Sequence, residues 1–293
     1  MKTMTVSKVE RLIIYPSLIA LFALLAFFDL PIMESLYNHD SVWARIFEFI
    51  GEQPFQFFTV FGGVLMFKYR PKDVLWKSIL FAVLGIVLAV FFALYAGSQM
   101  FSYIKELGLG EKYWLLFLVA SIYVAGAFTL AYLIKNIDDK KAFAFGVSVI
   151  LLYAFIWIAM NAGKVLWQRP RWRYLVTTDD PLGGYRNVWE PSPSWPFRSF
   201  FASFPSGHTM NAVGGLVIAY FFKDKISEKS YLLLRISVYL WTLLTALSRI
   251  IVGAHFASDV TMGFLLGFLL YDMTFTFLLP CLEKSVNKAR KIA

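Results

Sequence analysis

The chain has 293 residues, of which 59% are hydrophobic, 18% are aromatic and only 16% are charged. Soluble domains contain about 25% charged residues, so this composition excludes an ordinary soluble domain and favours an integral membrane protein. The net charge of +9 does not indicate a nucleic-acid partner, because the basic residues lie mostly in short segments between apolar runs, where membrane topology explains them.

Eight apolar segments follow one another along the chain. We expect each to be a helix, because lipid-exposed backbone must satisfy its own hydrogen bonds. The second and the sixth are only about 14 residues long, which is marginal for a bilayer core of about 30 Å unless neighbouring helices bury them. The predicted fold is therefore all-α: a single integral membrane domain over residues 1–293, forming a polytopic transmembrane helix bundle of about eight spans. The segments cover about 12–30, 54–67, 78–97, 113–134, 142–161, 209–222, 231–247 and 259–280.

The distribution of lysine and arginine predicts the orientation of the chain. If residues 1–11 are cytoplasmic, the segments on that side carry 17 Lys and Arg, whereas those on the opposite side carry 10. The positive-inside rule then places both termini in the cytoplasm. It also places the loops 162–208 and 248–258 together on the extracytoplasmic face of the cell membrane.

The stretch KVLWQRPRW, directly after the fifth apolar segment, contains Lys164, Arg169 and Arg171. These residues can serve as an interfacial basic anchor, with Trp167 and Trp172 in an aromatic belt. They can also bind an anion, since arginine offers phosphate a planar fork of donors and lysine adds a point charge.

The stretch FPSGHTM, residues 204–210, leads into the sixth apolar segment. Ser206 or Thr209 is a suitable N-cap for a helix that begins there. The N-terminus of a helix attracts anions through its free backbone N–H groups and its partial positive charge. His208 lies at that position and can titrate near neutral pH, although a lone histidine there is more often an interfacial residue than a catalyst.

The stretch SRIIVGAHFASD, residues 248–259, lies between the seventh and eighth segments and includes Arg249, His255 and Asp259. If His255 and Asp259 are helical, their spacing of four puts them on one face, where the carboxylate can accept the ring N–H. That contact would fix the tautomer and make the other ring nitrogen a better nucleophile. A local surface pair of histidine and aspartate is the alternative.

The combination of the three stretches is more specific than any one of them. The chain has three histidines, and the one outside these stretches, His39, lies beside Asp40 in a loop, where we expect it to be solvated. Basic clusters, a histidine at a helix start and a His–Asp pair suit phosphoryl transfer, in which catalysis is mainly positioning and charge neutralisation.

The three stretches resemble the signature of the type 2 phosphatidic acid phosphatase superfamily of membrane lipid phosphatases. Its parts read Lys-x6-Arg-Pro, Pro-Ser-Gly-His and Ser-Arg-x5-His-x3-Asp. Here the first part begins at Lys164, with Trp172 where the family usually has proline; the second is residues 205–208, and the third is residues 248–259. Residues 162–260 thus carry the signature and an extracytoplasmic loop. The resemblance implies a six-helix phosphatase-like core and leaves residues 1–160 unexplained.

The resemblance also implies a mechanism without a metal or any other cofactor. His255 would attack phosphorus and form a phosphohistidine, Asp259 would orient that ring, and His208 would protonate the leaving group. The sequence shows no acidic cluster near these stretches that could hold magnesium, and the single Cys281 excludes a cysteine-based metal cluster. The groups implied to hold the phosphate are Lys164, Arg171, Ser206, Gly207 and Arg249.

The loop 173–204 is long and rich in Trp, Pro, Gly and Arg, with Trp189 and Trp195 among them. It is either an interfacial cap or a lid that selects the head group. A site at the membrane surface favours an amphiphilic phosphate whose tail stays in lipid: phosphatidate, phosphatidylglycerophosphate, a polyprenyl diphosphate or a lipid A phosphate. The expected partners are this substrate and membrane lipids, and no nucleic acid. A homo-oligomer is a further alternative.

Three other functions compete with a lipid phosphatase. A transporter would place ionisable residues near the bilayer midplane, whereas the span interiors here are nearly free of charge apart from Arg235 and Asp272. A phosphotransferase could use the same site to pass the phosphoryl group to another lipid. A degenerate homologue that only binds lipid would not need His208, His255 and Asp259.

Overall fold

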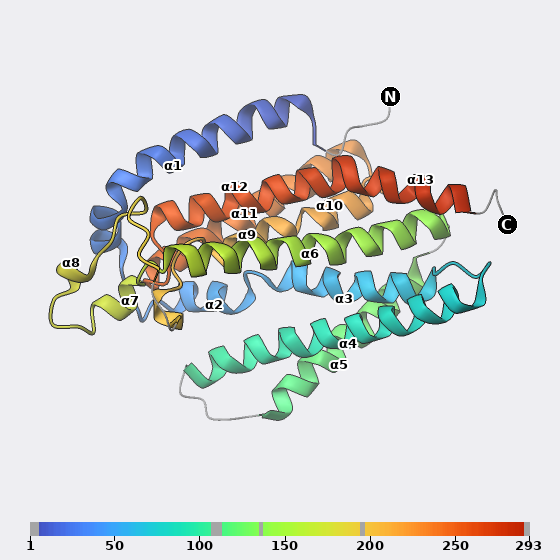
Figure 1. The fold of residues 1–293 in the computed structure, drawn as a ribbon, viewed down its shortest axis with the longest axis horizontal. Helices are drawn as coiled ribbons and strands as arrows, with labels where there is room; N and C mark the ends of the chain where they lie inside the picture. Colours follow the sequence, from blue (N-terminus) through green and yellow to red (C-terminus); the bar gives the residue numbers. More distant parts are fainter. Residues whose placement is uncertain (1–5, 107–112, 135–136, 194–196, 290–293) are drawn as a thin grey trace. The chain divides into compact units, whose positions relative to one another are not determined.

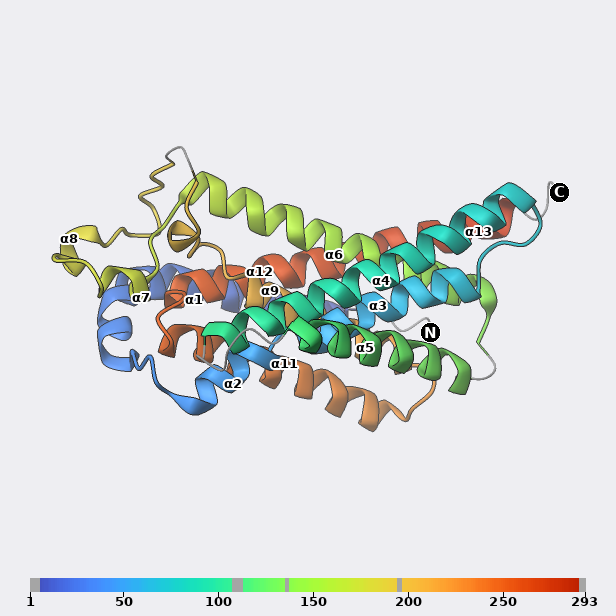
Figure 2. The ribbon, with the colours of Figure 1, turned by 90° about the horizontal axis from the view of Figure 1, so that it is seen from below.

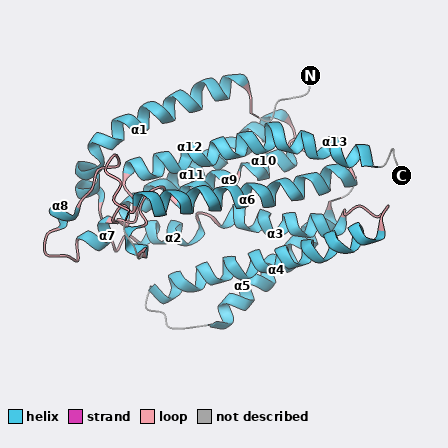
Figure 3. Ribbon diagram, viewed as in Figure 1, coloured by secondary structure: helices cyan, strands magenta, loops and turns pink. Residues whose placement is uncertain are grey.

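The computed structural model describes residues 6–106, 113–134, 137–193 and 197–289. Within these ranges the chain forms helices and loops and contains no strand, which confirms the all-α prediction (Figures 1 and 3). Six helical stretches are long and apolar enough to cross a membrane. They are Lys8–Leu36, Leu75–Lys105, Tyr113–Leu133, Asp139–Trp167, Glu228–Ile251 and Ala257–Ser285.

The two shortest of the eight predicted segments are also helical. The segment 54–67 lies in α3 (Gln53–Lys68), and the segment 209–222 is divided at Gly215 between α9 (Gly207–Gly214) and α10 (Leu216–Phe222). Most of the side chains of α3 and α9 are buried, as expected for short apolar helices surrounded by protein. The count of eight membrane spans stays a prediction.

The chain divides into two compact units, residues 1–52 with 154–271, and residues 53–153 with 272–293. In the second unit, α3 packs against α4 (Leu75–Glu106) and α5 (Tyr113–Leu133), which lie side by side in Figure 2. Gly63 and Gly85 let α3 and α4 approach closely, since a Cβ on either glycine would lie 2.7 Å from the carbonyl oxygen of the other. This unit also takes in the first part of α6 (Asp139–Trp167) and the last helix, α13 (Leu279–Ala289).

The first unit contains α1 (Lys8–Leu36), α2 (Val42–Ile50), the last part of α6, α9, α10, α11 (Glu228–Ile251) and nearly all of α12 (Ala257–Met273). Its short helices α7 (Trp172–Leu175), α8 (Pro181–Gly184) and η1 (Ser199–Phe201) belong to the long loop after α6. Helix α11 packs against α1, α2, α9 and α10. All the residues that the signature implicates lie in this unit.

Helices α9 and α12 meet through glycines. A Cβ on Gly263 would lie 2.6 Å from the Ser206 carbonyl oxygen, and a Cβ on Gly267 would lie 2.9 Å from that of Met210. Small residues four apart allow such close backbone contact between helices. The contact joins the start of α9 to the start of α12, where the Ser206 N–H donates to the Asp259 carbonyl oxygen at 3.0 Å.

Candidate active site

The structure gathers the two signature histidines among the three predicted phosphate-binding cations. His208 lies in the first turn of α9, and His255 lies in the turn between α11 and α12. The cations come from three places: Lys164 from the last turn of α6, Arg171 from the N-cap of α7, and Arg249 from the last turn of α11. All three act electrostatically on both rings, and the His208 charge acts on His255.

Burial and charge together favour neutral imidazoles in this site. Burial lowers the pKa of His255 well below its ordinary 6.5, and the positive charges of Arg249, Arg171 and Lys164 lower it further. The pKa of His208 is lowered by burial first and then by Arg249. Both rings therefore keep a lone pair at neutral pH when no anion is bound.

His255 is held by a main-chain carbonyl group. Helix α11 ends at Ile251, Gly253 adopts a φ of +67°, and α12 begins only at Ala257, so His255 lies in a turn. Its Nδ1 makes a hydrogen bond with the Ser203 carbonyl oxygen. Because a carbonyl group can only accept, the proton is on Nδ1 and the lone pair is on Nε2.

The prediction that His255 and Asp259 share a helical face is therefore wrong. Gly253 takes up a left-handed conformation that ends the helix before His255, and glycine adopts that conformation without strain. Asp259, which is fully buried in the first turn of α12, accepts instead from Arg169 Nη1 at 2.7 Å, Ser203 Oγ at 2.5 Å and the Phe256 N–H at 2.8 Å. It supports His255 indirectly, by fixing the residue whose carbonyl group holds the ring.

Arg169 has a different role from the other basic residues of its stretch. It is 1% exposed, and its guanidinium pairs with Asp259 and, through Nη2 at 2.8 Å, with Asp29 of α1. Asp29 also accepts from the backbone N–H of Ser258 at 2.8 Å. Sequence reasoning missed this cluster, although a carboxylate at the end of an apolar run was a signal, because such a residue usually has a buried partner.

The Pro-Ser-Gly-His stretch forms the N-terminus of α9 as predicted, with Ser206 as the N-cap. Its Oγ accepts from the Thr209 backbone N–H at 3.4 Å and from Thr209 Oγ1 at 3.0 Å. Gly207 faces α6, where a Cβ on it would collide with the sulfur of Met160 and lie 3.6 Å from Lys164 Nζ. The absence of a side chain at Gly207 brings its backbone close to that ammonium group.

Two glutamates that the signature does not contain complete this neighbourhood. Glu48 of α2 is 2% exposed, and its Oε1 lies 2.7 Å from Arg249 Nη1. The Glu48 carbonyl oxygen lies 3.2 Å from His208 Nε2, and Glu52 Oε1 lies 4.0 Å from the same nitrogen. Sequence reasoning treated residues 31–53 as a connection between spans, and no spacing in the chain relates these glutamates to the histidines.

His39 is exposed, as predicted, but it is not merely solvated. Arg45 Nη2 lies 2.6 Å from its Nε2 and 3.0 Å from its Nδ1, and Arg45 Nε donates to the His39 carbonyl oxygen at 3.0 Å. The pair lies in the connection between α1 and α2, so His39 helps to hold that connection.

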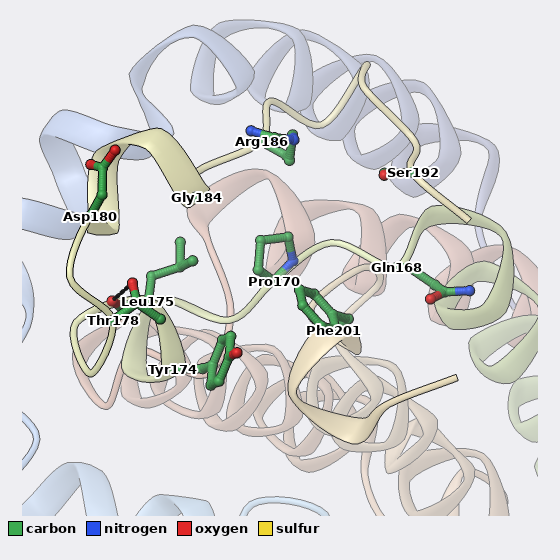
Figure 4. Close-up of a pocket in the computed structure, with 10 residues that line it drawn as sticks. All are labelled: Gln168, Pro170, Tyr174, Leu175, Thr178, Asp180, Gly184, Arg186, Ser192 and Phe201. Atoms are coloured by element: carbon green, nitrogen blue, oxygen red, sulfur yellow. Dashed lines mark hydrogen bonds between the residues drawn. The ribbon is translucent and has the colours of Figure 1, made fainter. Parts of the chain in front are cut away.

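The loop after α6 lines an open cavity of about 470 Å³ (Figure 4). Its walls include Gln168, Pro170, Tyr174 and Arg186, and the described residues that line it do not include either signature histidine. Trp189 is half exposed and contacts Phe27 of α1 at 5.2 Å between ring centroids. Trp195, which we also considered for a lid, lies outside the described residues. The choice between a cap and a lid stays a prediction.

The described residues also show no cluster with the composition of a metal site. Within the ranges that the structure covers, no three His, Cys, Asp or Glu side chains are grouped so that they could hold a metal ion. The site described above is instead rich in cations, and these suit an anionic ligand.

The sequence of this region matches a protein family and proteins of known name. The PAP2 superfamily profile matches residues 141–280. The chain is 30% identical over 179 residues to phosphatidylglycerophosphatase B of Haemophilus influenzae, in an alignment that covers 52% of this chain and 73% of that protein. It is 36% identical over 96 residues to phosphatidylglycerophosphatase B of Bacillus subtilis, covering 30% of this chain and 43% of that protein. No solved structure matches the chain.

The profile includes all three signature stretches, and the alignment with the Haemophilus protein extends over most of that relative. Together with the gathering of the signature residues in one compact unit, these matches lead to a single assignment. The chain belongs to the PAP2 superfamily.

Proposed function

We propose that this protein is an integral membrane phosphatase that hydrolyses a phosphomonoester or diphosphate of an amphiphilic lipid through a phosphohistidine intermediate. The observation that carries the proposal is the gathering of two imidazoles, one buried and one largely buried, and three cations in one place, at the ends of helices long and apolar enough to cross a membrane. The family and the two phosphatidylglycerophosphatase relatives support a lipid phosphatase.

The nucleophile in this scheme is His255 Nε2. In the first step, its lone pair forms a bond to phosphorus, the bond from phosphorus to the leaving oxygen breaks, and His208 gives that oxygen a proton. In the second step, water attacks phosphorus, His208 takes a proton from the water, and the nitrogen–phosphorus bond breaks. Inorganic phosphate leaves and His255 is regenerated, so the reaction needs neither a metal ion nor another cofactor.

The cations provide the binding energy for the phosphoryl group. Lys164, Arg171 and Arg249 would hold its oxygens, and the start of α9 adds the Gly207 N–H and Ser206. The same charges stabilise the transition state, since phosphoryl transfer depends mainly on positioning and electrostatics. Asp259 contributes by keeping the Ser203 carbonyl group, and with it the His255 tautomer, in place.

His208 becomes an acid when the substrate binds. In the absence of an anion, its lowered pKa keeps the ring neutral. A bound phosphate adds negative charge beside the ring, and negative charge favours the protonated form. The general acid is thus charged mainly in the complex, where its proton is used.

The names of the relatives favour a glycerophosphate lipid as the substrate, with phosphatidylglycerophosphate as the first to test. A single phosphomonoester on a hydroxylated head group fits one cluster of three cations. Phosphatidate and a polyprenyl diphosphate share the same chemistry and belong in the same assay. We place the protein in the inner membrane of a bacterium, with the site on the extracytoplasmic face.

The function is tested by phosphate release from these lipids in detergent, with EDTA present, for wild type and His255→Ala. We expect wild type to release phosphate and His255→Ala to be inactive, whereas Glu34→Gln, which changes an exposed glutamate of α1 outside the site, should match wild type. Loss of wild-type turnover in EDTA would reject the metal-free scheme. Transfer of label from the substrate to a second lipid, in place of phosphate release, would identify a phosphotransferase.

The orientation is tested with an impermeant thiol reagent. Ser192 is exposed in the loop after α6, so Ser192→Cys in a Cys281→Ser background offers one reactive thiol on that loop. We expect labelling from outside spheroplasts. Labelling only after lysis would place the loop, and the candidate site with it, on the cytoplasmic face.

A further inference from the structure

We propose that Glu48 and Glu52, two buried glutamates at the end of α2, form a fourth part of the active site, in which Glu48 positions the phosphate-binding Arg249 and Glu52 holds the acid His208. This inference rests on the proposed function. It assigns a catalytic purpose to a segment that lies more than 100 residues before the signature and outside the region matched by the family profile.

The burial of the two glutamates requires an explanation. Glu48 is 2% exposed and Glu52 is 3% exposed, and a carboxylate buried to this degree is costly unless ionic or hydrogen-bonding partners compensate it. Both lie within 4.0 Å of a predicted site residue, through a side-chain or main-chain atom. The chain therefore holds two negative charges at a place whose substrate is also negative.

Glu48 is placed to fix the geometry of Arg249. Its Oε1 lies 2.7 Å from Arg249 Nη1 and also accepts from Arg173 Nη1 at 3.1 Å, and its Oε2 accepts from Arg45 Nη1 at 2.6 Å. Although burial raises the pKa of Glu48, Arg249 and Arg173 hold it well below its usual range, so the carboxylate stays charged. A guanidinium tied at one nitrogen has lost much of its side-chain freedom before phosphate arrives, which lowers the entropic cost of binding.

The same turn of α2 determines how His208 is oriented. The Glu48 carbonyl oxygen can only accept, so His208 Nε2, which lies 3.2 Å away, carries a proton. Glu52 Oε1 lies 4.0 Å from that nitrogen, and Glu52 Oε2 accepts from Asn211 Nδ2 at 2.9 Å, one turn along α9 from His208. When His208 is doubly protonated, Nε2 faces the carboxylate, and the proton for the leaving group departs from Nδ1.

The charges around His208 show why Glu52 matters. Glu48 pairs with three arginines and also acts electrostatically on His208, whereas Glu52 lies 4.0 Å from His208 Nε2, accepts from Asn211 and acts on Lys164. Removing the Glu52 charge would leave the imidazolium facing mainly cations. Charged or titratable groups from every neighbouring element face His208. They are Glu48 of α2, Glu52 just after α2, Lys164 of α6, Arg171 before α7, Arg249 of α11 and His255 before α12.

The role of Glu52 is tested by the pH profile of kcat for Glu52→Gln. Without the carboxylate, protonated His208 is less stable, so the alkaline limb of kcat should move down by about one pH unit, at the low end of the effect of a charge within 4–6 Å. A lipid phosphate should be affected, whereas an activated aryl phosphate, whose leaving group needs no proton, should not. Glu34→Gln, which changes an exposed glutamate of α1, is the matched control. An unmoved limb, or an equal loss on both substrates, would overturn this role.

The role of Glu48 is tested with orthovanadate, a phosphate analogue, as a competitive inhibitor. Glu48→Gln should weaken vanadate inhibition and raise KM by roughly tenfold with a smaller change in kcat, whereas Glu48→Asp, which keeps the charge, should recover part of the loss. A uniform fall in kcat for both variants, with vanadate inhibition unchanged, would mean that Glu48 acts only in folding. If Glu48→Gln does not fold, Glu48→Asp is compared with wild type instead. Vanadate inhibition of Glu48→Asp as strong as that of wild type would then overturn the proposal.

The outcomes separate this inference from the proposed function. If wild type releases no phosphate, or if His255→Ala is fully active, the proposed function fails and the glutamate variants carry no information about catalysis. If wild type is active and His255→Ala is not, but the Glu48 and Glu52 variants behave like Glu34→Gln, only the inference about α2 fails.

Discussion

The two histidines of the site are supported in different ways. His255, 2% exposed, is held by the Ser203 carbonyl group and, behind it, by the fully buried ions Asp259, Arg169 and Asp29. His208, with 15% of its side chain exposed, is held by the last turn of α2, whose Glu48 pairs with the buried Arg249 and with two partly exposed arginines, Arg45 and Arg173. The difference suits the roles that we propose for them, because a nucleophile needs one fixed lone pair, whereas an acid must gain and lose a proton.

The largest effect that would sharpen this comparison is expected from His255→Ala. Without Nε2 no phosphohistidine can form, so kcat should fall by at least about 10³-fold. Phosphate release from a lipid phosphate measures the loss, and an unchanged elution profile in detergent shows that the variant is folded. Near-normal turnover would mean that another residue is the nucleophile.

His208→Ala should have a smaller effect that depends on the leaving group. General acid catalysis contributes typically 10²–10⁴-fold, so a lipid substrate with an alkoxide leaving group should slow by about 10²-fold or more. An activated aryl phosphate should slow much less, because its leaving group departs without a proton. The ratio of the two rates is the measurement, and an equal loss on both substrates would argue against the acid role.

Asp29→Asn tests the support behind His255, the proposed nucleophile. The substitution leaves Arg169 with one carboxylate partner where it had two, and we expect a loss of about 3 kcal/mol in the free energy of unfolding, at the low end of the cost of breaking a buried pair. Thermal unfolding in detergent measures it, with Asp40→Asn, a change at an exposed aspartate, as the control. Equal stability of the two variants would mean that Asp29 contributes little to the cluster.

The smallest expected effect is in the acid limb of the pH profile. The lowered pKa of His255 means that its ring takes up a proton only well below pH 6.5, so kcat/KM should be maintained as the pH falls through 6.5 and should decline only at lower pH. The same sign applies to stability: the unfolded ring binds a proton near pH 6.5 and the folded one does not, so stability is lost as the pH falls below that value. A decline in kcat/KM that begins above pH 6.5 would contradict the burial of His255 among cations.

Much of the fold was predictable, because apolar run length determines where membrane-crossing helices form. Each of the eight segments contains helix, and the structure adds that the segment 209–222 is interrupted at Gly215. Most of the long helices, though not α5, extend beyond the apolar runs at both ends, since polar residues such as those of 139–141 continue a helix that hydropathy alone does not include. The connection 31–53 was the main omission, because α2 has 9 residues and is too short to register as a span.

The site was predictable as far as its motifs extend. Lys164, His208 and Arg249 are recognisable by local spacing, and the structure brings them together. The hydrogen-bond partner of His255 was not predictable, because Gly253 redirects the chain and a main-chain carbonyl group leaves no trace in a residue pattern. Asp29 lies 140 positions from its partner Arg169, and Glu48 lies 201 positions from Arg249, so only tertiary packing reveals these pairs.

The glycine contact between α12 and α9 has a consequence for altering this protein. Gly263 lies one turn after Asp259 and leaves no room for a side chain above the Ser206 carbonyl oxygen, so the spacing between the start of α12 and the start of α9 is set by backbone touching backbone. Even a methyl group at residue 263 would therefore force the start of α9 away from the start of α12.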